Sequence, residues 1–433
     1  MKNISTVILA AGKSTRFKHS KSKIYQDLAG LSIIEHVYKL AKIISKDKNI
    51  IFVCNKTNIK ELKKIFPLAN FVIQKKQNGT ADAVFQAKKY LKNNNTLILF
   101  GDVPLISIKS IKKLIVSFKK NNSIGSMIAF KTKKPFGYGR VVVEGEYVSS
   151  VIEELNTTKI QKKIQLCNSG VILCNSSLLF DNISKISNKN KKKEKYLPDI
   201  FNIFHKINKN FNYILGSEDE MLGINSIKDL IKIDEIFQIN LKNKILDKGV
   251  IFYQPNSSRL SYDTKINSGS VIESHVIFKT GVVIGNNVLI KSHSVLEKCK
   301  INYSSSIGPS ARIRPKSEIG HNVKIGNYVE IKNSRIGNNT SISHLSYIGD
   351  SIVGNNVNIG AGTITCNYDG KKKNKTIIEN NVFVGSNCSL VAPIKIGAKS
   401  TIGAGSVITQ TIPKNHLAIE RTEVKIYRKK RKK

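Results

Sequence analysis

Residues 348–360 read Ile348-Gly349-Asp350-Ser351-Ile352-Val353-Gly354-Asn355-Asn356-Val357-Asn358-Ile359-Gly360, in which an aliphatic residue followed by glycine returns after five and six residues. The pair recurs through the C-terminal half of the chain, at Ile307-Gly308, Ile319-Gly320, Ile325-Gly326, Ile336-Gly337, Val384-Gly385, Ile396-Gly397 and Ile402-Gly403. Most steps are six or twelve residues, with slips to eleven and five and one long gap. Such a hexad period predicts a parallel β-helix in which three hexads make one triangular coil.

The aliphatic residue of each hexad is expected to point inward, where its burial stabilises the coil by roughly 1.5–3 kcal/mol. The following glycine suits a corner where a side chain would crowd the turn. We expect the β-helix over about 250–413, with one interruption at Cys366–Lys375 that carries Asn367, Tyr368 and Asp369. A polar insertion extruded from a regular coil is a common place for function.

In the first half of the chain, apolar strand-like runs alternate with helix-like segments. They are Val7–Leu9, Ile33–Ile44, Ile50–Val53, Ile59–Ile65, Phe71–Ile73, Ala81–Leu91, Thr96–Phe100, Ile108–Phe118 and Ser126–Phe130. This alternation predicts a doubly wound α/β domain with ligands at the carboxyl ends of the strands. We therefore expect an α/β domain at 1–225, a linker helix at 226–248 with apolar residues at helical spacing, and a β-helix domain with a basic tail at 249–433.

The composition indicates a cytoplasmic protein of two or more domains. The chain has 433 residues, it has no apolar stretch of membrane-spanning length, and Met1–Leu9 is too short and too polar for a secretory signal. Its six cysteines are scattered without C-x-x-C spacing, so neither disulfides nor a zinc site are expected.

The formal net charge of +41 does not predict a specific nucleic-acid partner. Lysine is spread evenly along the chain, and no aromatic-basic interleaving or nucleic-acid motif accompanies it. The tail Arg428–Lys433 is purely basic, and we expect it to attract polyanions nonspecifically.

Three segments of the first domain could carry chemistry. The run Thr6–Leu9 ends in small, polar and basic residues up to Arg16, which suits a loop that brings phosphate to backbone N–H groups, although a plain strand-turn is the alternative. Thr96–Phe100 ends in Gly101-Asp102, where a carboxylate could bind Mg²⁺ or simply form a turn. In Gln77–Ala81, the N–H groups and Thr80 could read a base edge or cap a helix.

The motifs resemble those of a known family in their residues and their order. Sugar-1-phosphate nucleotidyltransferases share Leu9–Arg16, Gly79-Thr80, Gly101–Pro104, Gly137–Arg140 and Asn168–Gly170. More specific are Arg312–Pro315, Gly326–Lys332, His344–Asp350 and Asn356–Tyr368. From about residue 4 to 421, the chain resembles the bacterial bifunctional N-acetylglucosamine-1-phosphate uridyltransferases/glucosamine-1-phosphate N-acetyltransferases.

The resemblance implies a Rossmann-like nucleotidyltransferase domain followed by a left-handed β-helix of hexapeptide repeats. The implied activities are acetyl-coenzyme A-dependent acetylation of glucosamine 1-phosphate and Mg²⁺-dependent uridyl transfer from UTP to N-acetylglucosamine 1-phosphate, which feed peptidoglycan and lipopolysaccharide synthesis. It also implies a homotrimer whose second active site is built between subunits.

For uridyl transfer, the resemblance implies one set of residues. Leu9, Ala10, Ala11 and Gly12 would line the nucleotide, Gln74, Gly79 and Thr80 would select uracil, and Arg16 and Lys23 would hold the phosphates. Phe100 and Gly101 would also belong to the nucleotide- and sugar-binding residues. Asp102 and Asn225 would hold Mg²⁺, and Gly139, Glu153 and Asn168 would hold the sugar. Because the attacking phosphate is already ionised, the reaction needs positioning and positive charge more than a general base.

For acetyl transfer, the resemblance makes His344 the general base and Glu330 the group that orients its imidazole. Arg314 and Lys332 would grip the sugar phosphate, and Tyr347 and Asn358 would contact the sugar. The acetyl-coenzyme A side would comprise Ala361, Asn367, Tyr368, Ser386, Ala404 and Arg421.

The chain departs from the family pattern at Ser14, Ser22, Phe100 and Met221–Gly223, where glycine, proline, tyrosine and an acidic residue are usual. A monofunctional pyrophosphorylase with a structural β-helix is one rival, and His344, Glu330 and the Asn367-Tyr368 insertion argue against it. A scaffold with a degenerate catalytic domain is another, and Asp102, Asn225 and Arg16 argue against that. A zinc carbonic anhydrase would need three convergent histidines, whereas only His321 and His344 lie near one another in the coil sequence.

Overall fold

The computed structural model describes residues 3–12, 17, 19, 22–120, 123–190 and 192–428. The chain divides into two compact units, Met1–Ile236 and Phe237–Lys433. The division falls inside helix α7 (Ile227–Leu246), where the sequence predicts a linker helix. Within the described ranges, no helix has both the length and the apolar character that a membrane span requires.

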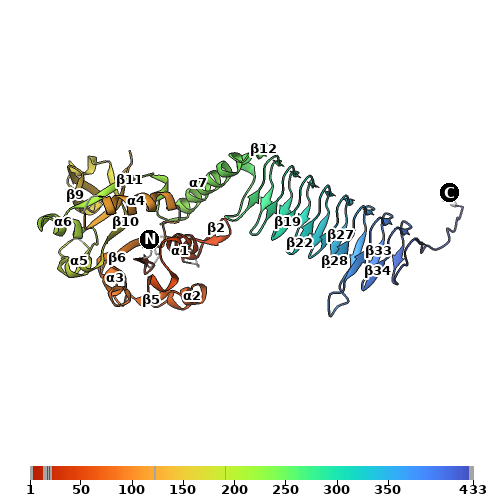
Figure 1. Cartoon of the computed structure of the whole chain (residues 1–433), viewed down its shortest axis with the longest axis horizontal. Coiled ribbons are helices and arrows are strands. Elements are labelled where there is room, and N and C mark those ends of the chain that lie inside the picture. Colours follow the sequence, from red (N-terminus) through yellow and green to blue (C-terminus); the bar gives the residue numbers. More distant parts are fainter. Residues whose placement is uncertain are drawn as a thin grey trace, which may run out of the picture. The chain divides into compact units, whose positions relative to one another are not determined.

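A nine-stranded sheet forms the centre of the first unit (Figure 1). Its strands are ordered β5-β4-β1-β6-β10-β7-β11-β9-β8. Strands β5, β4, β1 and β6 are parallel, whereas β10 runs antiparallel to both β6 and β7. The strands are β1 (Ile4–Leu9), β4 (Ile50–Cys54), β5 (Asn70–Ile73), β6 (Asn95–Phe100), β7 (Gly125–Lys131), β8 (Arg140–Glu144), β9 (Tyr147–Ile152), β10 (Leu166–Asn175) and β11 (Phe211–Gly216), and a separate ribbon pairs β2 (Asp27–Leu28) with β3 (Leu31–Ser32).

Helices cover both faces of this sheet because its central strands are apolar on both sides. On β1, Ile8 packs in the same apolar cluster as helices α1, α2 and α4, whereas Val7 packs in the cluster that contains α3. The helices are α1 (Ile33–Ile44), α2 (Ile59–Ile65), α3 (Thr80–Gln86), α4 (Ile108–Lys120), α5 (Ser176–Asn182) and α6 (Asp199–Lys206). The helix expected to reach Leu91 ends at Gln86, and a 3₁₀ turn follows at Lys88–Tyr90, as is common at helix C-termini.

The second unit is a left-handed parallel β-helix made of three sheets, whose stacked coils Figure 1 shows. One sheet contains β12 (Ile251–Phe252), β14 (Val271–Ile272), β17 (Leu289–Ile290), β20 (Ser306–Ile307), β23 (Lys324–Asn327), β26 (Ser341–His344), β29 (Asn358–Ile359), β32 (Phe383–Val384), β35 (Thr401–Ile402) and β37 (Leu417–Ala418). The next contains β15 (Ile277–Phe278), β18 (Val295–Leu296), β21 (Arg312–Ile313), β24 (Glu330–Lys332), β27 (Tyr347–Gly349), β30 (Ile364–Cys366), β33 (Ser389–Val391) and β36 (Val407–Ile408). The third contains β13 (Lys265–Ile266), β16 (Val283–Ile284), β19 (Cys299–Ile301), β22 (Ser317–Ile319), β25 (Arg335–Ile336), β28 (Ser351–Val353), β31 (Thr376–Ile378) and β34 (Ile394–Ile396).

The hexad residues of the β-helix are arranged as the sequence predicts. The aliphatic residues, such as Ile331 and Ile348, are fully buried in one continuous core. A side chain at Gly337 would lie 2.4 Å from the backbone of the next coil, so this glycine is needed for close approach and not for a left-handed conformation. The left-handed corners fall two residues later, at asparagines such as Asn339 (φ 56°), which tolerate that region well.

Candidate active sites

A cavity of about 450 Å³ lies at the carboxyl ends of β1 and β6 in the first unit. Most of the residues that the sequence singles out for uridyl transfer line it: Leu9, Ala10, Ala11, Gly12, Lys23, Gln74, Gly79, Thr80, Phe100, Asp102, Glu153 and Asn168. Gly101, Gly139 and Asn225 are immediate neighbours of lining residues. Arg16 and Ser14 lie outside the described residues.

Side-chain amides hold the loop that follows β1. Asn58 Nδ2 donates to the carbonyl of Ala10 at 2.7 Å, and Gln77 Nε2 donates to the carbonyl of Ala11 at 2.5 Å. In a planar trans peptide the N–H points opposite to the carbonyl, so the N–H groups of Ala11 and Gly12 face away from these amides. Backbone N–H groups directed in this way can bind phosphate oxygens.

The start of α3 packs against a segment that lies more than a hundred residues later in the chain. Gly79 has a φ of 105°, and a Cβ there would lie 2.3 Å from the carbonyl oxygen of Lys195. Thr80 Oγ1 accepts a hydrogen bond from the N–H of Leu197 at 2.9 Å. The hydroxyl of Thr80 therefore holds the segment around Leu197 against the start of α3. Gly79 is the N-cap residue of this helix.

Gln74 is buried beside this turn and is held in one orientation. Its Nε2 donates to the carbonyl of Gly79 at 3.0 Å and to Asp82 Oδ2 at 2.7 Å. With the amide nitrogen held, Oε1 is the atom of Gln74 that can accept a hydrogen bond from a base in the cavity.

A second part of the cavity brings together Gly139, Glu153 and Asn168. The N–H of Asn168 donates to the carbonyl of Gly139 at 2.9 Å, and a Cβ at Gly139 would lie 3.5 Å from Glu153 Oε1. Burial raises the pKa of Glu153 above its ordinary value, and the nearby carboxyl of Asp199 adds to the effect. The ring of Phe100 lies against Gly170, where a Cβ would approach it to 2.3 Å.

Lys23 connects the two predicted metal ligands. Its Nζ lies 2.5 Å from Asp102 Oδ2 and 3.3 Å from Asn225 Oδ1. The N–H of Ile224 donates to the carbonyl of Asp102 at 3.0 Å, which keeps Asn225 beside the end of β6. One cation therefore reaches both oxygens. Among the described residues, no group of three or more His, Cys, Asp or Glu side chains gathers in a way that could hold a metal.

In the second unit, four predicted residues occupy the same corner position of successive coils. The N–H of Gly362 donates to the carbonyl of His344 at 3.3 Å, that of Asn387 to Ala361 at 2.7 Å and that of Gly405 to Ser386 at 2.8 Å. The corner positions along this edge of the coil are therefore His344, Ala361, Ser386 and Ala404. Asn327 occupies the equivalent position one coil before His344.

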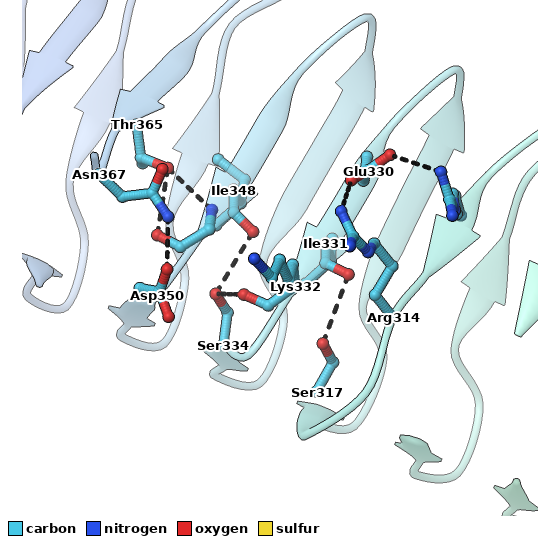
Figure 2. Close-up of polar contacts among 12 residues, drawn as sticks. Arg314, Ser317, Glu330, Ile331, Lys332, Ser334, Ile348, Asp350, Thr365 and Asn367 are labelled. Carbon is cyan, nitrogen blue, oxygen red and sulfur yellow. Dashed lines mark hydrogen bonds and ion pairs between the residues drawn. The ribbon is translucent and has the colours of Figure 1, made fainter. Parts of the chain in front are cut away.

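The strands that follow this edge present a basic face (Figure 2). Arg314, directly after β21, has the position equivalent to that of Lys332 on β24, and Tyr347 lies opposite Glu330 on β27. The carboxylate of Glu330 contacts Arg314 Nη1 at 2.6 Å and Arg312 Nη1 at 3.6 Å. The hydrogen bond to Glu330 raises the pKa of Arg314, and contact with the side chain of Lys373 lowers the pKa of Lys332.

The expected contact between Glu330 and His344 is not made within this chain. The imidazole Nδ1 instead lies 2.7 Å from Asn327 Oδ1. The register explains the difference, because Asn327 pairs with His344 across β23 and β26 whereas Glu330 pairs with Tyr347 beyond the corner.

The polar insertion leaves the coil after β30 as a loop (Figure 1). Its Asn367 donates a hydrogen bond to Asp350 on the preceding coil (Figure 2), and Tyr368 pairs with Lys373 across the loop. The remaining predicted residues lie on nearby coils. Asn358 is exposed on β29 opposite Ser341, and Arg421 Nη2 would lie 3.0 Å from a Cβ at Gly403, beside Ala404.

Comparison with known proteins decides the family. A family model described as a MobA-like NTP transferase domain matches residues 6–169, one described as a GMPPB C-terminal domain matches 299–368, and one described as a hexapeptide repeat of succinyl-transferase matches 375–410. Proteins named bifunctional protein GlmU are similar over nearly the whole chain. The protein of Paramagnetospirillum magneticum is 36% identical over 96% of this chain and 93% of its own, that of Buchnera aphidicola subsp. Schizaphis graminum 39% over 95% and 93%, and that of Campylobacter jejuni subsp. jejuni 38% over 98% and 97%.

The chain belongs to the GlmU family. It is a bifunctional enzyme of UDP-N-acetylglucosamine synthesis, with a nucleotidyltransferase domain for uridyl transfer and a hexapeptide-repeat domain for acetyl transfer. Among solved structures, a putative glucose-1-phosphate thymidylyltransferase from Bacillus anthracis in complex with a sucrose is similar over 54% of this chain and 94% of its own, with 16% identity and a TM-score of 0.44, a likeness too low to carry an argument.

Several residues at the two GlmU sites were not anticipated from the sequence. The first cavity is also lined by Gln77, Glu194, Tyr196, Leu197 and Pro198. Asn327 and Lys373 contact predicted residues of the second site. Gln77 lies inside the segment Gln77–Ala81 and Asn327 inside the motif Gly326–Lys332, and these two stretches were the available signals. Lys373 is one lysine among many, and the segment at 194–198 carries no local signal because its partners are more than a hundred residues away.

Proposed function

We propose that the first unit binds UTP through the loop after β1 and the buried Gln74. The N–H groups of Ala11 and Gly12 hold phosphate oxygens, and Gln74 Oε1 accepts the imide N–H of uracil. Leu9, Ala10, Gly79 and Thr80 complete the walls around the nucleotide. The fixed amide nitrogen of Gln74 supports this assignment, because it leaves one acceptor of defined orientation.

N-acetylglucosamine 1-phosphate is proposed to bind beside Gly139, Glu153 and Asn168. The absence of a side chain at Gly139 allows close approach of the sugar, and Glu153 and Asn168 supply polar groups for its hydroxyls. A phosphate oxygen of this substrate attacks the α-phosphorus of UTP, and pyrophosphate leaves. Lys23 and Arg16 stabilise the charge that develops on the α-phosphate.

Mg²⁺ is proposed to bind Asp102 and Asn225. The ammonium of Lys23 already contacts an oxygen of each residue, which supports a cation site here, and carboxylate and amide oxygens suit this metal. When bound, the metal supplies positive charge and orients the triphosphate. Phe100 and Gly101 bring Asp102 to the cavity at the end of β6.

In the second unit, His344 is proposed to take a proton from the amine of glucosamine 1-phosphate. The neutral amine then attacks the thioester carbonyl of acetyl-coenzyme A and the carbon–sulfur bond breaks. The departing thiolate takes the proton that the new amide nitrogen loses, so coenzyme A leaves as the thiol. Arg314 and Lys332 bind the sugar phosphate, with Tyr347 and Asn358 on the sugar. Acetyl-coenzyme A is proposed to follow the edge of the coil along Ala361, Asn367, Tyr368, Ser386, Ala404 and Arg421.

The observation that carries this proposal is that the base and the small residues lie along one edge of the β-helix. His344, Ala361, Ser386 and Ala404 stack on successive coils beside the face that presents Arg314 and Lys332. A base, a phosphate-binding pair and a row of small residues are what acetyl transfer from a long thioester to a sugar phosphate requires.

The proposal is tested by measuring both half-reactions on the full chain. His344→Ala should slow acetyl transfer about 10²–10⁴-fold at neutral pH and leave uridyl transfer from added N-acetylglucosamine 1-phosphate unchanged. Asp102→Asn should slow uridyl transfer and leave acetyl transfer unchanged, because an amide is a poorer magnesium ligand beside a triphosphate. His416→Ala, on an exposed histidine bonded to the carbonyl of Lys414, serves as the control. Equal acetylation by His344→Ala and the parent would remove His344 from the mechanism.

The assembly and location are also proposals. We propose a homotrimer that completes the acetyl-transfer site between subunits, and a cytoplasmic location, which the six unpaired cysteines support.

A further inference from the structure

The imidazole of His344 has a side-chain partner that none of the predicted roles includes. His344 Nδ1 lies 2.7 Å from Asn327 Oδ1. The two residues are paired across β23 and β26, and the N–H of Leu345 donates to the carbonyl of Asn327 at 3.0 Å. The amide side chain of Asn327 therefore stands directly beside the ring, one coil away.

The coil itself does not require asparagine at this position. The equivalent corner positions of other coils are occupied by Pro309, Ala361 and Ala404, and each precedes a residue in the left-handed region, as Asn327 does. The backbone contact of Asn327 uses its carbonyl and is independent of its side chain. The fold of the coil therefore does not depend on the amide of Asn327, and this amide hydrogen-bonds to His344.

The direction of this hydrogen bond determines the tautomer of His344. An amide oxygen can only accept, so the proton of the neutral imidazole must lie on Nδ1. The lone pair is then on Nε2, which becomes the nitrogen that can take a proton from an amine. If the imidazole carried its proton on Nε2, it would lose this bond and could not act as a base through that nitrogen.

We propose that Asn327 is a positioning residue for acetyl transfer, which holds His344 in the tautomer and orientation that leave Nε2 ready to accept the proton of the amine. This inference rests on the proposed role of His344 as the base. Glu330, the residue expected in this role, is held by Arg314 and Arg312 instead. Because asparagine is uncharged, it directs the ring without adding the charge that would favour the protonated form.

Three variants of the full chain test the proposal in assays of thiol release from acetyl-coenzyme A. Asn327→Ala should lower kcat about 10–100-fold, with little change in KM for either substrate, as is typical when a group that orients a functional histidine is removed. Asn327→Asp restores an acceptor and should recover kcat at high pH, while the acidic limb of its pH–rate profile moves to higher pH because a carboxylate stabilises the imidazolium. In the double variant Asn327→Ala/His344→Ala, the loss should equal that of His344→Ala alone.

Ser292→Ala is the matched control, because Ser292 has the equivalent corner position two coils earlier and its hydroxyl also bonds across coils, to Glu273 Oε2 at 3.0 Å. It should acetylate like the parent, and uridyl transfer should be unchanged in every variant. Parent-like kcat for Asn327→Ala, an unmoved acidic limb for Asn327→Asp, or an additive loss in the double variant would overturn the proposal. If His344→Ala acetylated as fast as the parent, the proposed function of the site would fail instead.

Discussion

Glu330 is tied to two arginines on the basic face of the β-helix, and its carboxylate lies 2.6 Å from Arg314 and 3.6 Å from Arg312. A carboxylate in this position fixes the guanidinium that is proposed to bind the sugar phosphate. Its role should therefore appear in substrate binding and not in proton transfer. Glu330→Gln keeps the size of the side chain and removes its charge, so Arg314 should be held less firmly. We expect KM for glucosamine 1-phosphate to rise about tenfold, a loss of about 1.4 kcal/mol, with kcat nearly unchanged.

Initial rates over a range of glucosamine 1-phosphate concentrations measure this change. Glu318→Gln is a suitable control, since Glu318 pairs with Lys300 and Arg335 on another sheet of the same coils. A fall in kcat at constant KM would return Glu330 to the role of orienting the imidazole.

At the scale of elements, the turn before α3 and the segment at 195–197 hold one another in place. Gly79→Ala would place a Cβ 2.3 Å from the carbonyl of Lys195, at a φ of 105° that other residues rarely adopt. The strain should cost about 1–3 kcal/mol or displace the later segment, along with the Thr80–Leu197 hydrogen bond. We expect a higher KM for UTP and a lower thermal midpoint of the first unit, with acetyl transfer unaffected.

The control for this prediction is Gly145→Ala. Gly145 also has a positive φ, 61°, but open space surrounds its Cβ position, so only the backbone term applies. Equal effects of the two substitutions on the KM for UTP would show that contact with Lys195 does not matter.

The spacing of apolar residues in the sequence predicted many helices and strands well, because burial of one face sets that spacing. Helices α1 and α2 have the bounds that their apolar spacing predicts, and the hexads predict the core of the coil. What the pattern lacked was the pairing between elements. The slips of one residue in the hexads and the bends at each corner decide that Asn327, and not Glu330, stands beside His344. In the same way, no local feature joins Gly79 to Lys195, since that contact depends on how distant segments pack.

At the scale of the whole molecule, apolar side chains remain exposed around the acetyl-transfer edge. Leu345 is 62% exposed and Tyr328 64% exposed, directly after His344 and Asn327, and Ile364 and Val407 are exposed on the sheet that follows. Tyr328 and Leu345 have equivalent positions on neighbouring coils, and adjacent exposed apolar side chains beside a site favour cover by another subunit. The hexads specify the coil but leave the number of copies open, so the trimer needs its own test.

We expect light scattering to give about 145 kDa, three times the 48.2 kDa of one chain. If the acetyl-transfer site is completed by a neighbouring copy, acetylation per subunit should fall when the enzyme is diluted far enough to dissociate, whereas uridyl transfer should not.

Leu345→Asn offers a further check, because asparagine suits the left-handed backbone at this corner (φ 50°) but removes the apolar contact. It should shift the measured mass toward the monomer at lower dilution than the parent requires. A monomeric mass at concentrations where acetylation is at full rate would refute the trimer. It would mean that a single subunit carries the second activity.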